Sequence, residues 1–409
     1  MLKSYKYELN PTEEQKVLIN KTFGCVRFVY NWGLAKKKEA WEKDKKYITR
    51  FEFQKELPLL KKSEEYGWLK IPAAQSLINS LINLDLAYKN FFREVKKGNK
   101  TGFPKFKSKN SKQSVQFPND VSIKRNQIRL PKIGLVKYYK SREIEGKIKT
   151  TTVSKTPAGR YFVSILCDTG VPFPEKKEIK KSTAVGIDLG IKTFAYTSDG
   201  QVVENQKYLE QSLKKLRVEQ RSLARKKKGS KSRERQRLKV AKVYEKVANQ
   251  RKDFLHNIST ELIRRYDTIV IEDLNIKDMI QNKNLARAIS DCGWWNFREM
   301  LTYKAEWYGK NLVVIDKFEP SSKMCSGCGE INKELKLSDR KWECKSCKTN
   351  HDRDFNAAKN IRQMGLNKVA GDAANCELTC DNSQSVSQRI LHESVGHQVG
   401  VSVLIGPKH

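Results

Sequence analysis

The sequence predicts a multidomain protein of mixed class, in which an α+β N-terminal half precedes an α/β C-terminal half. Three observations predict it: a change from helical to β-like patterning early in the chain, an alternation of strands and helices later, and a strongly positive charge. The 409 residues include 81 Lys and Arg against 46 Asp and Glu, a formal net charge of +35. This length suits two or three domains, and so large a cationic surplus calls for a polyanionic partner. We therefore expect a nucleic-acid-binding protein.

The N-terminal half begins with a short strand within residues 1–10. Thr12 opens a capping-box pattern that starts a helix, and helical periodicity dominates residues 11–99. Residues 100–180 instead hold short β-like runs separated by Gly and Pro. The pattern predicts a β-rich domain, made of residues 1–10 and 100–180, with a helical block inserted into it.

Strands alternate with helices in the C-terminal half. The order is three strands, long basic helices, a strand, an aromatic helix, a strand and a final helix. This is the RNase H-like α/β pattern, in which long helices cover a mixed sheet. The domain is predicted to span residues 181–320 and 351–364, with a cysteine-rich insertion at residues 321–350. Residues 365–409 have weak periodicity and are predicted to form a poorly structured tail.

Three acidic residues interrupt or end apolar segments of this pattern. Asp188 shares a strand face with Gly186 and other small residues, which leaves room for a hydrated metal bound to a phosphate. Glu272 follows the apolar run 268–271 at a strand end, where open α/β sheets bind ligands. Asp354 begins a helix whose alanines one turn later would let it lie against the sheet. Together the three carboxylates predict a catalytic site in which two Mg²⁺ ions, about 4 Å apart, hydrolyse a phosphodiester.

Each acid also has a purely structural explanation, and these alternatives stay open at this point. Asp188 could be a turn residue, Glu272 a solvated strand end, and Asp354 an acid favoured by a helix N-terminus. Asp273 and Asp352 are the nearest alternative ligands. The first is expected on the opposite strand face and the second as a helix cap.

The insertion carries the motif C-x2-C-x15-C-x2-C, and its ligands would be Cys325, Cys328, Cys344 and Cys347. Two such pairs are typical of a tetrahedral zinc site. Four protein ligands leave no open coordination position, so one structural Zn²⁺ is expected. An odd total of nine cysteines also fits a reducing compartment better than a disulfide framework.

These motifs together resemble the TnpB family of small bacterial insertion-sequence elements, which is similar to the type V CRISPR effectors. The most specific stretches are residues 186–190 (Gly-Ile-Asp-Leu-Gly), 271–274 (Ile-Glu-Asp-Leu) and the block 322–358 that contains the four cysteines. Residues 30–32 and 87–92 also look like that family.

The resemblance covers residues 1–364 and implies an RNA-guided endonuclease that cleaves double-stranded DNA beside a short target-adjacent motif. It implies a RuvC nuclease domain interrupted by a zinc finger, and a β-barrel wedge domain that carries an inserted helical recognition lobe. The implied partners are a guide RNA from the transposon end and a target DNA. Asp188, Glu272 and Asp354 match the three catalytic acids of the family, whereas the tail has no matching motif.

Two other functions fit the same scaffold. An RNA-guided repressor would bind without cutting, although three intact acids argue against it. A transposase or resolvase could use the same fold, since a fold alone does not define a function. The chain has no apolar run of the ~20 residues that a membrane span needs and no secretory signal pattern at its start. We therefore expect a cytoplasmic protein of the bacterial nucleoid.

Residues that read the DNA motif are harder to predict. Gln75 and Asn79 lie four residues apart on the polar face of a predicted amphipathic helix. Amide side chains can pair with base edges in the major groove, adenine above all. The alternative is that both are ordinary solvated positions.

Overall fold

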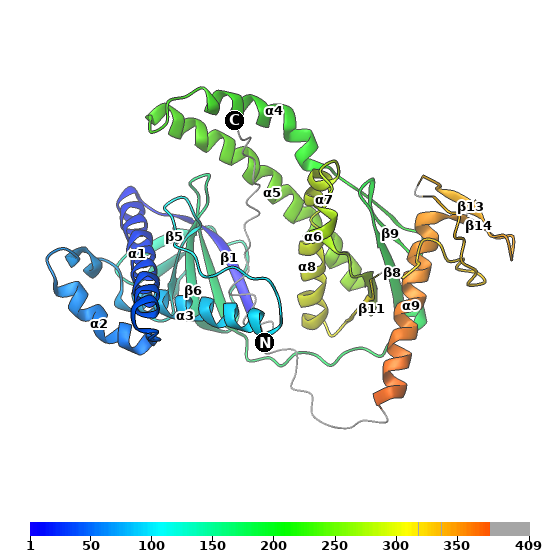
Figure 1. The fold of residues 1–409 in the computed structure, drawn as a ribbon, viewed down its shortest axis with the longest axis horizontal. Coiled ribbons are helices and arrows are strands. Elements are labelled where there is room, and N and C mark those ends of the chain that lie inside the picture. The colour runs from blue at the N-terminus through cyan, green and yellow to red at the C-terminus, as the bar shows by residue number, and fades with distance from the viewer. Residues whose placement is uncertain (318, 337, 377–409) are drawn as a thin grey trace. The chain divides into compact units, whose positions relative to one another are not determined.

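The computed structural model describes residues 1–317, 319–336 and 338–376. These residues form two compact units, the first from Met1 to Val171 and the second from Pro172 onward. Figure 1 shows the elements of each unit, and the two units are described separately. None of the described helices is long and apolar enough to cross a membrane.

The first unit is built on a seven-stranded antiparallel sheet with the order β2-β6-β7-β1-β5-β4-β3. Its strands are β1 (Leu2–Asn10), β2 (Gln113–Phe117), β3 (Ser122–Lys124), β4 (Gln127–Leu130), β5 (Gly134–Tyr138), β6 (Lys147–Lys155) and β7 (Tyr161–Asp168). Alternate side chains of β7 are buried, as expected for a strand with one face on the core. Strand β1 pairs with both β7 and β5, so the first strand of the chain lies in the same sheet as the strands of residues 113–168.

A helical block interrupts this sheet between β1 and β2. It contains α1 (Glu13–Asp44), α2 (Arg50–Lys62), the short 3-10 helix η1 (Gly67–Lys70) and α3 (Ala74–Lys96). The predicted capping box is confirmed, since Thr12 Oγ1 accepts from the Gln15 amide and Gln15 Oε1 accepts from the Thr12 amide. Helices α1 and α3 pack closely at Gly33, where an added Cβ would lie 3.0 Å from a methyl group of Leu84.

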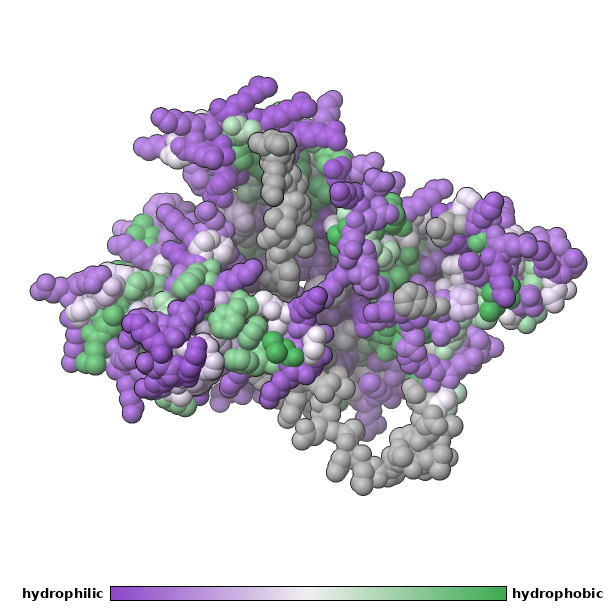
Figure 2. Space-filling view, viewed as in Figure 1, coloured by the Kyte–Doolittle hydropathy of each residue, from purple (hydrophilic) through white to green (hydrophobic). Residues whose placement is uncertain are grey.

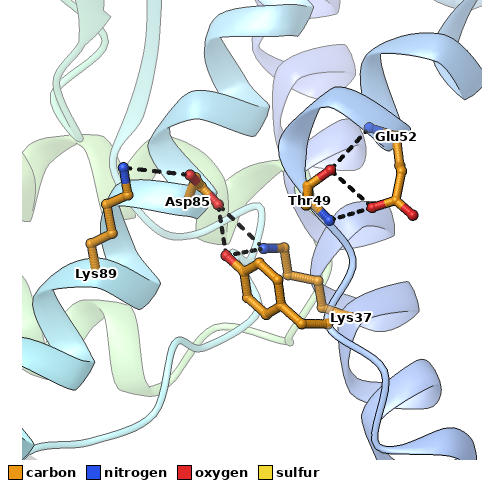
Figure 3. A network of polar contacts seen from close by, with 6 residues as sticks. Lys37, Thr49, Glu52, Asp85 and Lys89 are labelled. Carbon is orange, nitrogen blue, oxygen red and sulfur yellow. Dashed lines mark hydrogen bonds and ion pairs between the residues drawn. The ribbon is translucent and has the colours of Figure 1, made fainter.

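A polar network joins α1, α3 and the segment before α2 (Figure 3). The buried Lys37 ammonium lies 3.3 Å from Asp85 Oδ1, and the Tyr47 hydroxyl donates to the same oxygen at 3.2 Å. A second capping box, between Thr49 and Glu52, starts α2 beside this network. A buried charge must be paired in this way. The network therefore fixes α1, α3 and the segment before α2 to one another.

The second unit contains a five-stranded mixed sheet with the order β10-β9-β8-β11-β12. Its strands are β8 (Ala184–Leu189), β9 (Thr193–Thr197), β10 (Val202–Glu204), β11 (Thr268–Glu272) and β12 (Asn311–Ile315). Strand β11 is parallel to both β8 and β12, and the other pairs are antiparallel. The predicted mixed sheet is therefore present.

Helices cover both faces of this sheet. The helices of the second unit are α4 (Tyr208–Ala224), α5 (Lys231–Arg265), α6 (Ile276–Met279), α7 (Ala286–Cys292), α8 (Trp294–Trp307) and α9 (Arg353–Cys376), with the short helix η2 (Lys181–Thr183) before β8. Ile187 on one face packs with Leu255 of α5 and Phe297 of α8, whereas Val270 on the other face packs with Ile361 of α9. The alternation of side chains along β8 and β11 separates these two layers.

Helices α4 and α5 carry most of the basic run of the chain. They pack along a thin seam of Leu216, Val240 and Val243. Figure 2 shows hydrophilic residues over most of the rest of this hairpin. So small a seam leaves most lysine and arginine side chains of the hairpin exposed to solvent, where they can interact with a polyanion.

A buried lysine joins α8 to α5. Lys304 Nζ donates to the His256 carbonyl at 2.8 Å, to Ser259 Oγ at 2.7 Å and to Thr260 Oγ1 at 2.6 Å. Burial, and secondly the positive charge of Arg264, lowers the pKa of Lys304 to about 8. The folded chain therefore holds this proton less tightly than the unfolded chain does.

The final helix is longer than predicted, because α9 runs to Cys376 rather than ending near Met364. Residues 365–376 are thus helical and were wrongly assigned to a poorly structured tail. Two of the residues that make contacts here are not hydrophobic, so the sequence shows no hydrophobic periodicity. Gly365 lies against Val270, and the ammonium of Lys368 binds Asp316 at 2.8 Å. The rest of the predicted tail, residues 377–409, lies outside the described residues.

Candidate functional site

Asp188 and Glu272 lie side by side on neighbouring parallel strands. Strand β8 is paired with β11 so that Ile187 is opposite Ile271. Asp188 and Glu272 are the next positions in that register, and paired positions in a sheet share a face. Both carboxylates therefore leave the sheet on one side, at the carboxyl ends of the two strands.

Helix α9 brings Asp354 to the same place by crossing β8 in direct backbone contact. A Cβ added to Gly186 would lie 2.2 Å from the carbonyl oxygen of Ala358 and 2.5 Å from the amide nitrogen of Arg362. Asp354 lies one helical turn before Ala358, just as Asp188 lies two residues after Gly186 on the same strand face. Ala357, Ala358 and Ile361 are all fully buried, as the predicted close packing requires.

The first turn of α9 is held by a second contact. The Phe355 ring packs edge-on against Tyr196 of β9, with centroids 5.1 Å apart, and Tyr196 is the antiparallel partner of Asp188. Asp352 Oδ1 accepts from the amides of Asp354 and Phe355 at 3.1 and 3.2 Å. Asp352 is therefore the helix cap that the sequence predicted.

The three carboxylates interact electrostatically. Burial raises the pKa of Asp188 to about 7, and the nearby charges of Glu272 and Asp354 add to the rise. Burial also raises the pKa of Glu272, against the effect of a hydrogen bond of 2.7 Å from Ser321 Oγ. Like charges gathered in a partly buried place disfavour ionisation unless a cation balances them.

Arg340, which the sequence did not single out, supplies one balancing charge. Its guanidinium Nη1 lies 3.0 Å from both carboxylate oxygens of Asp354. The Arg340 carbonyl also accepts from the Arg353 amide at 2.8 Å. One arginine among many in so basic a chain gives no signal of its own, and only the fold shows that it meets an acid of the site.

Asp273 lies apart from these acids. It pairs with Arg298 at 2.5 Å and with Lys317 at 3.7 Å, and Arg298 belongs to α8, which covers the other face of the sheet. The side chain thus points away from α9, as expected from its position after Glu272 in the strand.

The four cysteines of the insertion come together. Their Sγ atoms all lie within 4.8 Å of one another, and the pairs Cys325–Cys347 and Cys328–Cys344 are each 3.6 Å apart. Of the residues that the structure describes, they are the one group of three or more His, Cys, Asp or Glu side chains that gathers this closely. Four thiolates in a closed group suit a tetrahedral structural Zn²⁺.

The insertion also contains β13 (Lys341–Glu343) and β14 (Asn350–Asp352), and two asparagines of α9 hold its start. Asn356 Nδ2 donates to the Met324 carbonyl at 2.7 Å, and its Oδ1 accepts from the Ser326 amide at 2.9 Å. Asn360 Nδ2 donates to the carbonyls of Ser321 and Met324 at 2.7 and 2.6 Å. The segment before the first cysteine pair is thereby fixed to the helix that carries Asp354.

The predicted motif-reading pair lies in the first unit. Gln75 is exposed near the start of α3. Asn79 is half-buried and donates through Nδ2 to Gln116 Oε1 on β2, an oxygen that also accepts from Asn83 at 2.9 Å. Asn79 thus lies beside the sheet, in an amide cluster that the sequence did not predict.

Family models match three parts of the chain. Residues 164–283 match the OrfB_IS605 model, described as "Probable transposase", and residues 294–361 match the TNB domain of Cas12f1-like proteins. Residues 1–46 match a helix-turn-helix model of the same family. In this structure residues 1–46 contain strand β1 and the single helix α1.

Full-length relatives agree with these matches. A Streptomyces pristinaespiralis protein named "Putative RNA-guided DNA endonuclease" is 39% identical over 370 residues, which is 89% of each chain. An Escherichia coli K12 relative with the same name and the addition InsQ is 32% identical and covers 89% of this chain and 92% of its own. The Cas12f1 chain of a complex with guide RNA and target DNA has a similar fold, with a TM-score of 0.52 at 14% identity over 88% of this chain and 98% of its own. The chain therefore belongs to the OrfB_IS605 (TnpB) family.

Proposed function

We propose that this protein is an RNA-guided endonuclease that cleaves double-stranded DNA beside a short motif, with Asp188, Glu272 and Asp354 as its catalytic acids. The observation that carries the proposal is their placement: two adjacent strand ends and one helix start bring three carboxylates together at one end of the β8–β11 pair. The names of the full-length relatives support the activity.

The residues present fit two Mg²⁺ ions. Magnesium prefers carboxylate oxygens and retains several waters, so three acids suffice to hold it. Burial is the main cause of the raised pKa of Asp188, and the neighbouring carboxylates of Glu272 and Asp354 add to it. A bound cation would stabilise the ionised form against both effects. When bound, such ions neutralise charge on the attacking and leaving oxygens of the phosphodiester.

The protein's own groups would position this site. Ser321 orients Glu272 through its hydrogen bond, and Gly186 lets α9 approach until Asp354 faces Asp188. Arg340 adds a guanidinium at the edge of the acids, where it can also pair with a phosphate oxygen. We assign the cysteines of the insertion one Zn²⁺ without a chemical role, since a closed four-thiolate site offers no open position.

The domains of the family are proposed to follow the boundaries predicted from the sequence. The sheet of β1–β7 would be the β-barrel wedge domain, and residues 11–99 the recognition lobe inserted into it. Residues 181–320 and 351–364 would form the RuvC domain around the zinc finger at 321–350. The basic α4–α5 hairpin and the wedge domain would hold the guide RNA and its heteroduplex by the backbone, while base pairing reads the sequence.

The test compares the purified chain, with and without its co-purified RNA, on a duplex that matches the RNA. Cleavage that needs both the RNA and magnesium supports the proposal. Binding without cutting would indicate a repressor, and RNA-independent cutting would indicate a resolvase-like or transposase-like enzyme. We also propose that the protein acts in the bacterial cytoplasm, so that its substrates are plasmid and nucleoid DNA.

A further inference from the structure

A surface of phenylalanine rings and lysine side chains lies at the C-terminal end of α3. We call the set Phe92, Phe103, Phe106, Lys38 and Lys107 the phenylalanine–lysine surface. The three rings are 49%, 44% and 52% exposed, although folding normally buries phenylalanine. Figure 2 shows hydrophobic residues at the surface among hydrophilic ones over α3. Clustered exposed rings with a polar rim mark an interaction site more often than single exposed ones do.

The segment that carries two of these rings is fixed although it forms neither helix nor strand. Asn31 of α1 binds the backbone of Lys107 twice: its Nδ2 donates to the carbonyl at 2.9 Å, and its Oδ1 accepts from the amide at 2.8 Å. Gln113 Nε2 donates to the carbonyls of Lys109 and Ser111 at 3.0 and 2.7 Å. Rings held in this way are preorganised, so a ligand spends little free energy on ordering them.

The rings and ammonium groups are arranged for stacking. Phe103 packs edge-on against Tyr88 and Phe91, with centroids 5.3 and 4.9 Å apart, which anchors it. Lys38 Nζ lies 5.1 Å from the centroid of Phe106 and 5.8 Å from that of Phe103. A nucleobase can stack on such a ring while the ammonium meets the neighbouring phosphate.

We propose that the phenylalanine–lysine surface binds unpaired nucleotides of the guide RNA, with a base stacked on Phe106 and a phosphate beside Lys38. This inference rests on the proposed function, because that function makes RNA a constant partner. Residues 98–112 hold five lysines and no acid, so their charge is complementary to a polynucleotide. Proteins bind RNA chiefly at unpaired stretches whose bases stack on aromatic rings, whereas a target DNA offers unpaired bases only in the strand that the guide displaces.

The experiment uses the full chain, freed of RNA, with three labelled probes: short oligouridylate, oligothymidylate of equal length, and a fully paired RNA duplex. Phe106→Ala should weaken oligouridylate binding about fivefold to a hundredfold, the range for loss of one stacked base. Phe106→Trp should restore it. The salt dependence should not change in Phe106→Ala, which loses no charge, whereas Lys38→Met should lower its slope by about 0.7.

The matched control is Phe51→Ala, because Phe51 is 60% exposed on α2 and has the Arg50 guanidinium 4.7 Å from its centroid. It should bind every probe as the wild type does. The inference is overturned if Phe106→Ala binds oligouridylate with wild-type affinity. It is also overturned if this variant loses as much affinity for the paired RNA duplex, or loses affinity for oligothymidylate alone. Guided cleavage separates the two proposals, since RNA binding without cleavage refutes only the proposed function.

Discussion

Gly186→Ala tests how the site is assembled, because the substitution adds one methyl group where β8 and α9 touch. The new Cβ would lie 2.2 Å from the carbonyl oxygen of Ala358, whereas non-bonded heavy atoms normally lie about 3.5 Å apart. Both partners are backbone, so no side chain can turn aside and α9 must move by about 1 Å. Asp354 moves with it, away from Asp188.

A displacement of that size at a catalytic group lowers the rate by about a hundredfold. The measurement is single-turnover cleavage of a guide-matched duplex by Gly186→Ala loaded with its RNA. Zinc content and RNA affinity should stay at wild-type values, which shows that the loss is not general unfolding.

Two controls bracket this result. Gly371→Ala changes the same helix where an added Cβ meets nothing within 4 Å, and should cleave normally. Gly365→Ala meets the two methyl groups of Val270 at 2.3 and 2.8 Å. These are side-chain atoms rather than backbone, so Val270→Ala should make room for the new methyl group and partly reverse the loss of cleavage. Wild-type cleavage by Gly186→Ala would refute the view that close packing of α9 positions Asp354.

Four further predictions follow from the same geometry. Asp188→Ala should abolish cleavage and leave RNA and target binding nearly intact. Alanine at Glu272 or Asp354 should have the same effect, and combining the substitutions should cause no additive loss. Cleavage near the wild-type rate in magnesium would contradict the assignment. The purified chain should hold one zinc per molecule by metal analysis, and Cys344→Ser should lose it, destabilise the insertion and lower cleavage indirectly. Lys304→Met should remove a pH dependence of the folding stability. The pKa of Lys304 is about 8 in the folded chain, whereas the unfolded chain keeps this proton up to pH ~10.5. Between these two pH values the free energy of unfolding of the wild type should therefore rise by up to ~1.4 kcal/mol per pH unit relative to the variant, as measured by denaturant unfolding. Gln75→Ala or Asn79→Ala should change the preferred bases at particular positions of a randomised flanking-motif library, whereas a uniform loss or no change would return both to a structural role.

Patterns that depend on neighbours in the chain were readable from the sequence. The capping box at Thr12, the alternate apolar face of β8 and the strand–helix order of the second unit each follow from local spacing, and the structure confirms them. The two cysteine pairs were equally clear, because metal-ligand spacing is a local property. The same reasoning placed Asp352 at a helix start, where the structure has it.

Features made by contacts between distant segments could not be read in this way. Arg340 meets Asp354 across 14 residues, and Asn79 meets Gln116 across 37; neither pair has a spacing that distinguishes it from other polar residues. The end of α9 was missed for a related reason. Its packing rests on a glycine and a lysine, which lower a hydrophobic periodicity even where the helix lies against the sheet.

Helix α9 connects the four-cysteine insertion with the three acids. Asp354, Asn356 and Asn360 lie on its first two turns, so the helix that presents one acid also holds the segment that leads to the first cysteine pair. That segment in turn contains Ser321, which donates to Glu272. Loss of zinc therefore has a short physical route to the acids: loosening of residues 321–326 would free Ser321 from Glu272 and remove the hydrogen-bond acceptors of both asparagines. A structural metal can in this way control the geometry of a catalytic site without touching the substrate.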